Sequence, residues 1–263
     1  MQITQIRNAT IIINYAQTRF LVDPWLGPKD YMPGFEGAVH PEIRQPRVEL
    51  PCPIEKITDV DAVILTHVHP DHWDDFAAKA LNKNIKIFAQ SETDKQFLSS
   101  LGFADVEILT QSSTRFRRVT LFKTPGQHGK REIVKPVCEQ LGMPYDAMGV
   151  VFKAQAEPTL YLAGDTIWCP EVQNALDTYR PDVIVVNACA ASVANGEHLI
   201  MGKEDILQTS RYAPHAAIVA SHMDTVSHLT VTRQDLKELV KENNLSNQFI
   251  PNDGETLTFT AKN

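Results

Sequence analysis

The sequence predicts a single α+β domain that spans residues 1–263. Three observations support this prediction: β-rich runs come first, later strands alternate with helices, and no repeat or linker rich in Gly or Ser divides the chain. With 263 residues, 43% of them hydrophobic, the chain can bury a substantial core. Length alone would permit two small domains, so the missing linker favours one.

The N-terminal segment alternates and breaks like a small β-meander. β-rich runs cover residues 3–6, 10–14 and 19–22, and the sequence Asp23-Pro24-Trp25-Leu26-Gly27-Pro28 ends the third run. From residue 27 to about residue 57 the chain is rich in proline and has little periodicity. Such a long irregular stretch is typical of disorder or of a functional lid. Its aromatic residues Tyr31 and Phe35 favour an ordered loop that covers something.

Strands and helices alternate in the rest of the chain. The apolar run 61–65 indicates a buried strand, and Ser91-Glu92-Thr93-Asp94 begins a helix that Gly102 ends. Residues 129–148 are expected to form a second irregular insertion. Further strands are expected at 85–89, 106–109, 114–124, 150–154, 159–163, 182–186, 216–220, near 249 and at 256–260, and further helices at 170–179, 203–212 and 232–242.

Composition argues against several classes of protein. The formal charge is 25 − 32 = −7 and the longest basic run is Arg117-Arg118, so we expect no nucleic-acid surface. No segment approaches the roughly 18 continuous apolar residues of a membrane span, and the first residues do not begin a signal peptide. The scattered Cys52, Cys138, Cys169 and Cys189 indicate reduced thiols, and hence a cytoplasmic protein. The sequence does not decide whether the chain forms a homo-oligomer.

The most informative segment follows the buried strand at 61–65. It reads Thr66-His67-Val68-His69-Pro70-Asp71-His72-Trp73-Asp74-Asp75 and holds three of the nine histidines. Neutral imidazole and ionised carboxylate are the ligands that zinc, iron and manganese prefer. Because burying such groups is unfavourable without a partner, a bound metal is the simplest account of this cluster.

Four more residues that could bind a metal or take part in catalysis lie where a predicted strand ends and a loop begins. They are Asp23, His128, Asp165 and His222. Strand ends are where a sheet presents functional side chains. Taken singly, each histidine is more often structural and each aspartate more often a turn residue. Two roles are open for Asp23: it either orients a ligand histidine through a hydrogen bond or forms a turn.

The order of these residues resembles the metallo-β-lactamase superfamily, whose signature is His-x-His-x-Asp-His, then a lone His, a lone Asp and a last His. All seven positions are filled in order between residues 67 and 222. The resemblance implies a four-layer αββα sandwich, with two mixed sheets face to face, helices outside and the metals where strand ends meet.

The resemblance also implies a cytoplasmic, dinuclear metal-dependent hydrolase. Two divalent ions are implied, with zinc the first choice and manganese or iron as alternatives. His67, His69 and His128 would hold the first ion; Asp71, His72 and His222 would hold the second, and Asp165 would bridge both. A bridging hydroxide would attack a small-molecule ester, lactone or phosphodiester, and Asp71 would act catalytically by passing a proton to the leaving group.

Two short motifs point to branches of the superfamily. Pro125-Gly126-Gln127-His128 with the nearby Arg131 is similar to the phospholipase-D-like members that cleave N-acyl phosphatidylethanolamine. The segment 201–205, paired with the last histidine motif, is similar to ascorbate-6-phosphate lactonase-like members. Lys29, Lys130 and Arg131 could meet an anionic phosphate or carboxylate on the substrate, while Trp25, Tyr31 and Phe35 suggest an apolar wall.

Two other functions stay open. A non-catalytic metal-binding or sensor module would bind metal without turnover, and a mononuclear iron oxidoreductase of the same fold would hold one ion. His198 and His228 lie in loops beside a motif; an exposed surface position is the simpler expectation for both, with contact to substrate as the alternative.

Overall fold

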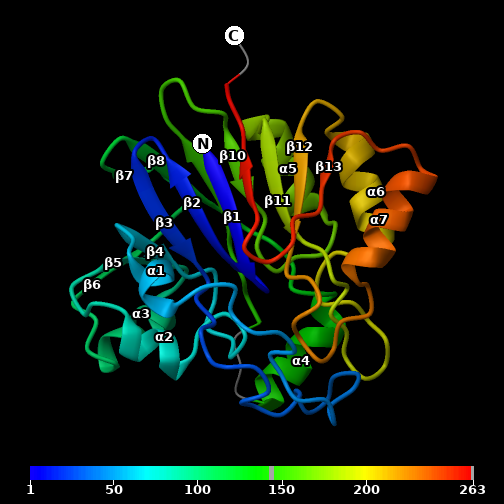
Figure 1. The fold of residues 1–263 in the computed structure, drawn as a ribbon, viewed down its shortest axis with the longest axis horizontal. Coiled ribbons are helices and arrows are strands. Elements are labelled where there is room, and N and C mark those ends of the chain that lie inside the picture. The colour runs from blue at the N-terminus through cyan, green and yellow to red at the C-terminus, as the bar shows by residue number, and fades with distance from the viewer. Residues whose placement is uncertain (142–144, 262–263) are drawn as a thin grey trace.

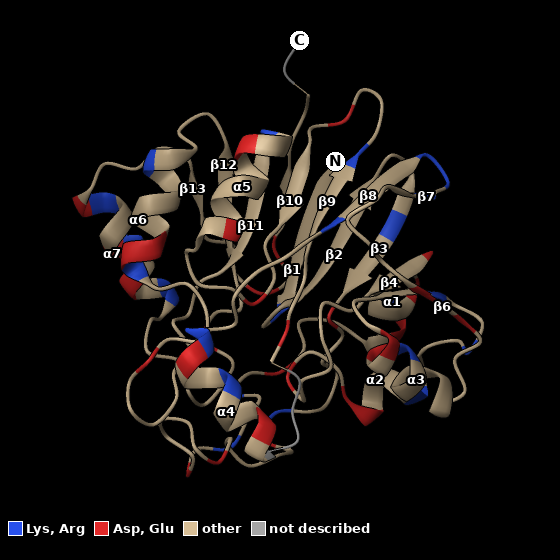
Figure 2. Ribbon diagram, turned by 180° about the vertical axis from the view of Figure 1, so that it is seen from behind, with Lys and Arg blue, Asp and Glu red and all other residues tan. Residues whose placement is uncertain are grey.

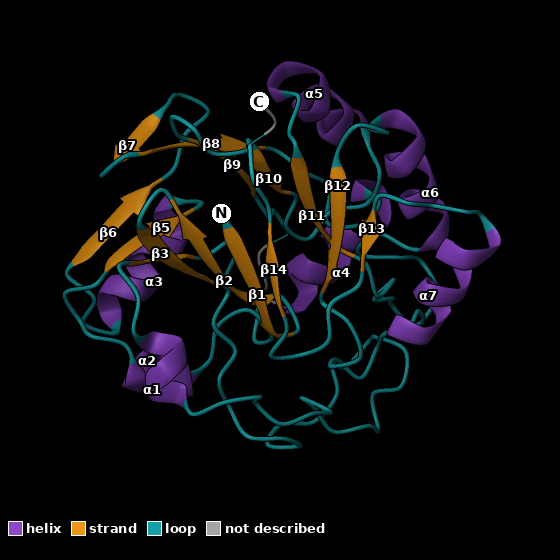
Figure 3. Ribbon diagram, turned by 45° about the horizontal axis from the view of Figure 1, so that its top comes forward, coloured by secondary structure: helices purple, strands orange, loops and turns teal. Residues whose placement is uncertain are grey.

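A computed structural model describes residues 1–141 and 145–261, and two seven-stranded sheets face each other in it (Figures 1 and 3). The first sheet has the strand order β14-β1-β2-β3-β4-β5-β6. Its strands are β1 (Gln2–Arg7), β2 (Thr10–Tyr15), β3 (Thr18–Val22), β4 (Ala62–Ile64), β5 (Lys86–Ala89), β6 (Asp105–Ile108) and β14 (Thr256–Thr258).

The second sheet has the strand order β13-β12-β11-β10-β9-β8-β7. Its strands are β7 (Thr114–Phe116), β8 (Val119–Thr124), β9 (Gly149–Lys153), β10 (Leu160–Leu162), β11 (Val183–Asn187), β12 (Ala217–Ser221) and β13 (Gln248–Phe249). Both sheets combine parallel and antiparallel pairs, as expected from a chain whose hairpins give way to strand–helix alternation.

Helices cover the outer face of each sheet (Figure 3). On the first sheet lie α1 (Ile54–Thr58), α2 (Asp75–Ala80) and α3 (Glu92–Ser100), and on the second lie α5 (Pro170–Tyr179), α6 (Lys203–Tyr212) and α7 (Arg233–Glu242). The remaining helix, α4 (Arg131–Leu141), lies among the loops at one end of the sheets (Figure 1). Among the described residues, no helix combines the length and apolar character of a membrane span.

Alternating side chains in the strands explain the layers. In β4, Ala62 and Ile64 pack between the two sheets, whereas Val63 packs under the helices of the first sheet. In β10, Leu160 and Leu162 point inward and Tyr161 packs under α5 to α7. Strands buried on both faces are apolar at every position, with the two-residue period deciding which core each side chain enters. The predicted αββα sandwich is confirmed.

The same topology brings several strand ends to one edge. β3 and β4 are parallel neighbours, and so are β10, β11 and β12. β8 also runs in the direction of β10, because both are antiparallel to β9. The loops that follow β8, β10 and β12 therefore leave the second sheet on one side. The loop after β4 lies there too, since the Thr66 carbonyl accepts a hydrogen bond from the backbone N–H of Met148, just before β9.

Three expectations about local structure were wrong. Residues 129–148 are not wholly irregular, because they contain α4, which carries acidic and basic residues along its length (Figure 2). These charged residues are exposed, whereas Val134 and Cys138 are buried. Residues 114–124 form two strands, since Arg117 takes a positive φ of 53° and turns the chain between them. The stretch from residue 27 to about residue 57, expected to be irregular throughout, ends in the short helix α1.

Candidate metal centre

The structure brings all seven predicted ligands together at the shared sheet edge. Each is at most 5% exposed. Their ligand atoms form three groups, and within each group the atoms lie within 4.8 Å of one another. The groups are His67, His69 and His128; His67, His72 and Asp165; and Asp71, His72 and His222.

Asp165 Oδ2 lies at the middle of the cluster. Four imidazole Nε2 atoms lie close to it: that of His72 at 3.2 Å, that of His128 at 3.8 Å, that of His67 at 3.9 Å and that of His222 at 4.0 Å. One carboxylate oxygen therefore faces histidines from both predicted sets. This is the position that a bridging ligand requires.

The turn before Asp165 depends on glycine. Gly164 has a φ of 71°, and a Cβ at this position would lie 2.4 Å from the carbonyl oxygen of Met148. Only a residue without a side chain fits there. His222 itself has a φ of 64°, a region uncommon for residues other than glycine and often found at functional sites.

The first predicted set points its nitrogen atoms at a common centre. His69 Nδ1 lies 3.0 Å from His67 Nε2 and 3.3 Å from His128 Nε2. His69 thus offers the opposite ring nitrogen from the other histidines. In the second set, Asp71 Oδ2 lies 3.2 Å from His222 Nε2 and 3.8 Å from His72 Nε2.

The donor set fits divalent cations. His72 Nε2 is buried and makes no well-aligned hydrogen bond within the described part of the chain, although Asp165 Oδ2 is 3.2 Å away. Three buried carboxylates, those of Asp23, Asp71 and Asp165, share this site with imidazoles. Nitrogen and oxygen atoms aimed at one another in a buried site are what zinc, manganese or iron require.

Hydrogen bonds from neighbouring groups hold the far side of the histidine rings. Asp23 Oδ2 lies 2.9 Å from His72 Nδ1, and the same carboxylate accepts from the backbone and hydroxyl of Thr66. His67 Nδ1 lies 3.0 Å from Thr66 Oγ1. The carbonyl of Leu199 lies 3.0 Å from His128 Nδ1. Such contacts fix the ring so that the other nitrogen faces the centre. Asp23 therefore contacts a predicted ligand, which agrees with the role of orienting a ligand histidine.

Sequence reasoning missed three residues that hold predicted ligands. Asn187, the last residue of β11, donates to Asp165 Oδ1 at 2.6 Å, which leaves Oδ2 facing the histidines. Asn8 donates to the carbonyl of Asp71 at 3.1 Å, and Cys189 Sγ lies 3.5 Å from His222 Nδ1. Asn8 sits in the β1–β2 turn with a φ of 53°, which an asparagine in any ordinary turn also adopts. No signal in the sequence distinguishes it.

The ionisation of the clustered side chains supports the interpretation of this cluster as a cation site. Burial raises the pKa of Asp165, but the neighbouring histidines, His72 and His222 foremost, together hold it well below its usual value. Burial and the neighbouring His72 and His69 hold the pKa of His67 well below its usual value, so His67 is neutral and able to ligate. Burial lowers the pKa of His72 and His222, but the nearby acids raise that of His72 to about 10 and that of His222 well above its usual value. Cations that bind here would therefore replace protons on these two rings.

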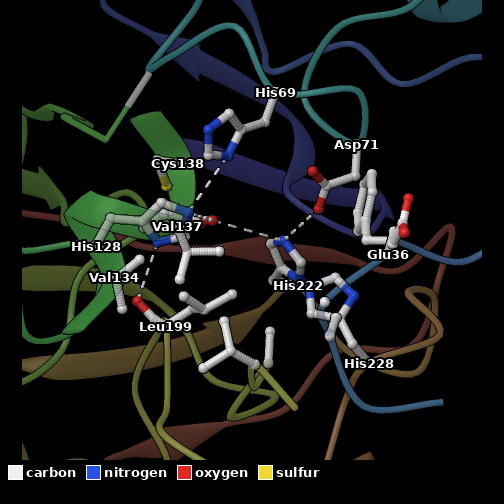
Figure 4. Close-up of a pocket in the computed structure, with 16 residues that line it drawn as sticks. Glu36, His69, Asp71, His128, Val134, Val137, Cys138, Leu199, His222 and His228 are labelled. Carbon is white, nitrogen blue, oxygen red and sulfur yellow. Dashed lines mark hydrogen bonds and ion pairs between the residues drawn. The ribbon is translucent and has the colours of Figure 1, made fainter. Parts of the chain in front are cut away.

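A cavity of about 210 Å³ opens on this centre (Figure 4). Its walls are mainly apolar, and its polar lining comes from predicted ligands together with Glu36 and His228. The apolar wall comprises Phe35, Ala38, Val134, Val137, Cys138, Ala191, Val193 and Leu199. No lysine or arginine occurs among the described residues that line the cavity.

Several expectations about the pocket were wrong. Lys130 pairs with Glu197 and Arg131 contacts Asp146, so neither cation faces the cavity. Lys29 does not line it either.

Of the three aromatic residues suggested as a wall, Phe35 lines the cavity, whereas Trp25 and Tyr31 do not. His228 is buried and lines the cavity, contrary to the expected surface position. His198 is half-buried beside Gly202 and does not line the cavity, so neither expectation for it holds.

Comparison with known proteins agrees with this geometry. The family profile described as "Beta-lactamase superfamily domain" matches residues 18–223. The UPF0173 protein YddR of Bacillus subtilis is 44% identical over 98% of this chain and 100% of its own length. The chain belongs to the UPF0173 family of this superfamily.

Two solved structures resemble the whole chain. An isothiocyanate hydrolase from Delia radicum gut bacteria is 42% identical with a TM-score of 0.94, covering 99% of this chain and 100% of its own. A possible metal-dependent hydrolase from Veillonella parvula is 43% identical with a TM-score of 0.94, covering 98% of this chain and 99% of its own. Family membership and the clustered ligands make this chain a metal-dependent hydrolase by class.

Proposed function

We propose that the chain is a dinuclear hydrolase whose substrate is a small, uncharged, apolar electrophile, with isothiocyanates as the first choice. The observation that carries the proposal is the position of Asp165 Oδ2 among four imidazoles, at the base of a cavity whose described lining contains no basic residue. The likeness to an isothiocyanate hydrolase supports the substrate choice.

The residues divide into two ligand sets in this proposal. His67, His69 and His128 would hold one ion, and Asp71, His72 and His222 would hold the other. Asp165 would serve both ions, while Asn187 donates a hydrogen bond to its Oδ1. Two divalent cations bound there supply Lewis acidity and lower the pKa of a bound water towards neutrality.

Asp71 moves the proton in this scheme. Its carboxylate lies 3.2 Å from His222 Nε2 and 3.8 Å from His72 Nε2, and in this scheme it would relay the proton of the attacking water. With an isothiocyanate, water adds across the C=N bond: oxygen bonds to the central carbon, and Asp71 passes the proton to nitrogen. The resulting thiocarbamic acid splits into an amine and carbonyl sulfide, so all atoms of water and substrate are accounted for.

The apolar cavity argues against the anionic substrates of the lactonase-like and phospholipase-like branches. A phosphate group is normally met by Arg, Lys or a helix N-terminus. The described lining offers no lysine or arginine, and Glu36 would repel an anion. Val134, Val137 and Leu199 instead form a surface suited to a short hydrocarbon group.

The test combines metal counting with a substrate screen. We expect two metal ions per chain and turnover of allyl isothiocyanate, with little on bis(4-nitrophenyl) phosphate. His69→Ala and Asp165→Asn should both abolish turnover and lower metal content, whereas the exposed His40→Ala should change neither. One ion per chain would favour the oxidoreductase alternative. Two ions without turnover of any isothiocyanate, ester or lactone would favour the sensor alternative.

A further inference from the structure

His228 lies in the loop that follows β12 and reaches the cavity described above (Figure 4). Its side chain is 5% exposed. Its carbonyl accepts a hydrogen bond from the backbone N–H of Ser192 at 3.0 Å. Its ring meets the ring of Phe35 edge to face, with centroids 5.2 Å apart. Backbone and ring are therefore both held in place at the cavity wall.

One polar atom of this ring has no partner. His228 Nδ1 is buried and makes no hydrogen bond to any residue that the structure describes. A buried polar atom left unpaired is unfavourable, and most such atoms in folded proteins have partners. Because the same ring lines the cavity, a bound ligand is an available hydrogen-bond partner for this imidazole.

Among the residues that the structure describes, His228 is the best placed to recognise a neutral ligand. Seven of these described residues are polar and line the cavity, and five of the seven belong to the predicted ligand set: His69, Asp71, His128, Asp165 and His222. The other two are Glu36 and His228. Glu36 is exposed, whereas His228 is buried. Burial lowers the pKa of His228 to about 4, so the ring is uncharged near neutral pH and can donate one hydrogen bond.

Building on the function proposed above, we propose that His228 is a substrate-binding residue. Its ring N–H donates a hydrogen bond to the terminal heteroatom of the bound electrophile, while the hydrocarbon group lies against Val137 and Leu199. This contact orients the electrophilic carbon towards the cluster around Asp165. A cavity that is otherwise apolar gains its directional recognition from this one imidazole.

The test uses two substitutions of His228 in the full-length, metal-loaded protein. His228→Leu removes the donor, whereas His228→Asn keeps a side-chain N–H donor at this position. His198→Leu is the matched control, because His198 also follows a strand but does not line the cavity. KM and kcat are measured with allyl isothiocyanate, and the dissociation constant of N-allylthiourea, which is not hydrolysed, is measured by calorimetry.

We expect His228→Leu to raise KM and the N-allylthiourea dissociation constant at least tenfold at unchanged metal content, and His228→Asn to recover most of the binding. The control should match the wild type. Equal affinity of the wild type and His228→Leu for N-allylthiourea, or no binding by the wild type, would overturn the role of His228. Wild-type protein that binds N-allylthiourea but turns over no isothiocyanate would instead overturn the proposed function.

Discussion

Replacing Asp23 by asparagine should weaken one metal site without changing a ligand. The Asp23 carboxylate accepts three hydrogen bonds: from the backbone N–H of Thr66 at 2.7 Å, from the Thr66 hydroxyl at 2.7 Å, and from His72 Nδ1 at 2.9 Å. The backbone bond goes to Oδ1 and the other two go to Oδ2. An asparagine that keeps the backbone bond must place its NH₂ group where Oδ2 was.

That NH₂ group would oppose the N–H of His72. The Thr66 hydroxyl can rotate and accept a hydrogen bond instead, but His72 Nδ1 can accept only if its proton moves to Nε2. Nε2 is the atom that faces Asp165, and a protonated Nε2 cannot bind a metal. Loss of such an outer hydrogen bond typically lowers metal affinity about 10- to 100-fold. This corresponds to about 1.4–2.8 kcal/mol.

The assay is metal retention during dialysis against increasing concentrations of a chelator, followed by elemental analysis. Asp61→Asn is the matched control. Asp61 lies just before the start of β4, at the end of this strand away from the metal centre, and it contacts Arg19 and Arg117 rather than a predicted ligand. We expect Asp23→Asn to lose one ion at chelator concentrations that leave the wild type and Asp61→Asn loaded. If Asp23→Asn retained both ions as the wild type does, Asp23 would not set the tautomer of His72.

Three further predictions concern other parts of the molecule. Phe152→Ala should lower the free energy of unfolding by about 3–5 kcal/mol, since Phe152 is fully buried against Tyr15 and Phe20; a loss below about 1 kcal/mol in chemical denaturation would contradict this core assignment. Val137→Phe should lower kcat/KM for 2-phenylethyl isothiocyanate more than for methyl isothiocyanate at unchanged metal content, and the opposite selectivity would place the hydrocarbon group elsewhere. Hydrogen bonds from Thr232 lower the pKa of Asp235 from 3.8 to about 2, so its contribution to stability is present above about pH 4 and is lost as the pH falls through 2. The difference in urea midpoint between metal-free wild type and metal-free Asp235→Asn should therefore shrink between pH 4 and pH 2, and a constant difference would contradict the capping role of Asp235.

Much of the scaffold could be predicted because local signals agreed with the global fold. The helix expected at residues 203–212 has those bounds in the structure, and Ser91 and Thr232 cap α3 and α7 as their sequences indicate. Helix α4 was missed because it contains Pro136, which normally ends a helix. Its buried Val134 and Cys138 pack over the cavity, and this tertiary contact outweighs the local signal.

The cluster of seven predicted ligands could be anticipated from the sequence, whereas the residues around it could not. Seven residues of metal-binding type follow strands in a fixed order, and that order can be read from the chain. Asn8 and Asn187 carry no such pattern, because they act through contacts with residues far along the sequence. His228 was misjudged for the same reason: the loop that buries it returns to Phe35, nearly two hundred residues earlier in the chain.

The most direct test of the account is an anomalous-scattering map from crystals of the metal-loaded protein. It should show two peaks per chain, one enclosed by His67, His69 and His128 and the other by Asp71, His72 and His222, with Asp165 between them. A single peak, or a second peak away from these side chains, would contradict the dinuclear centre.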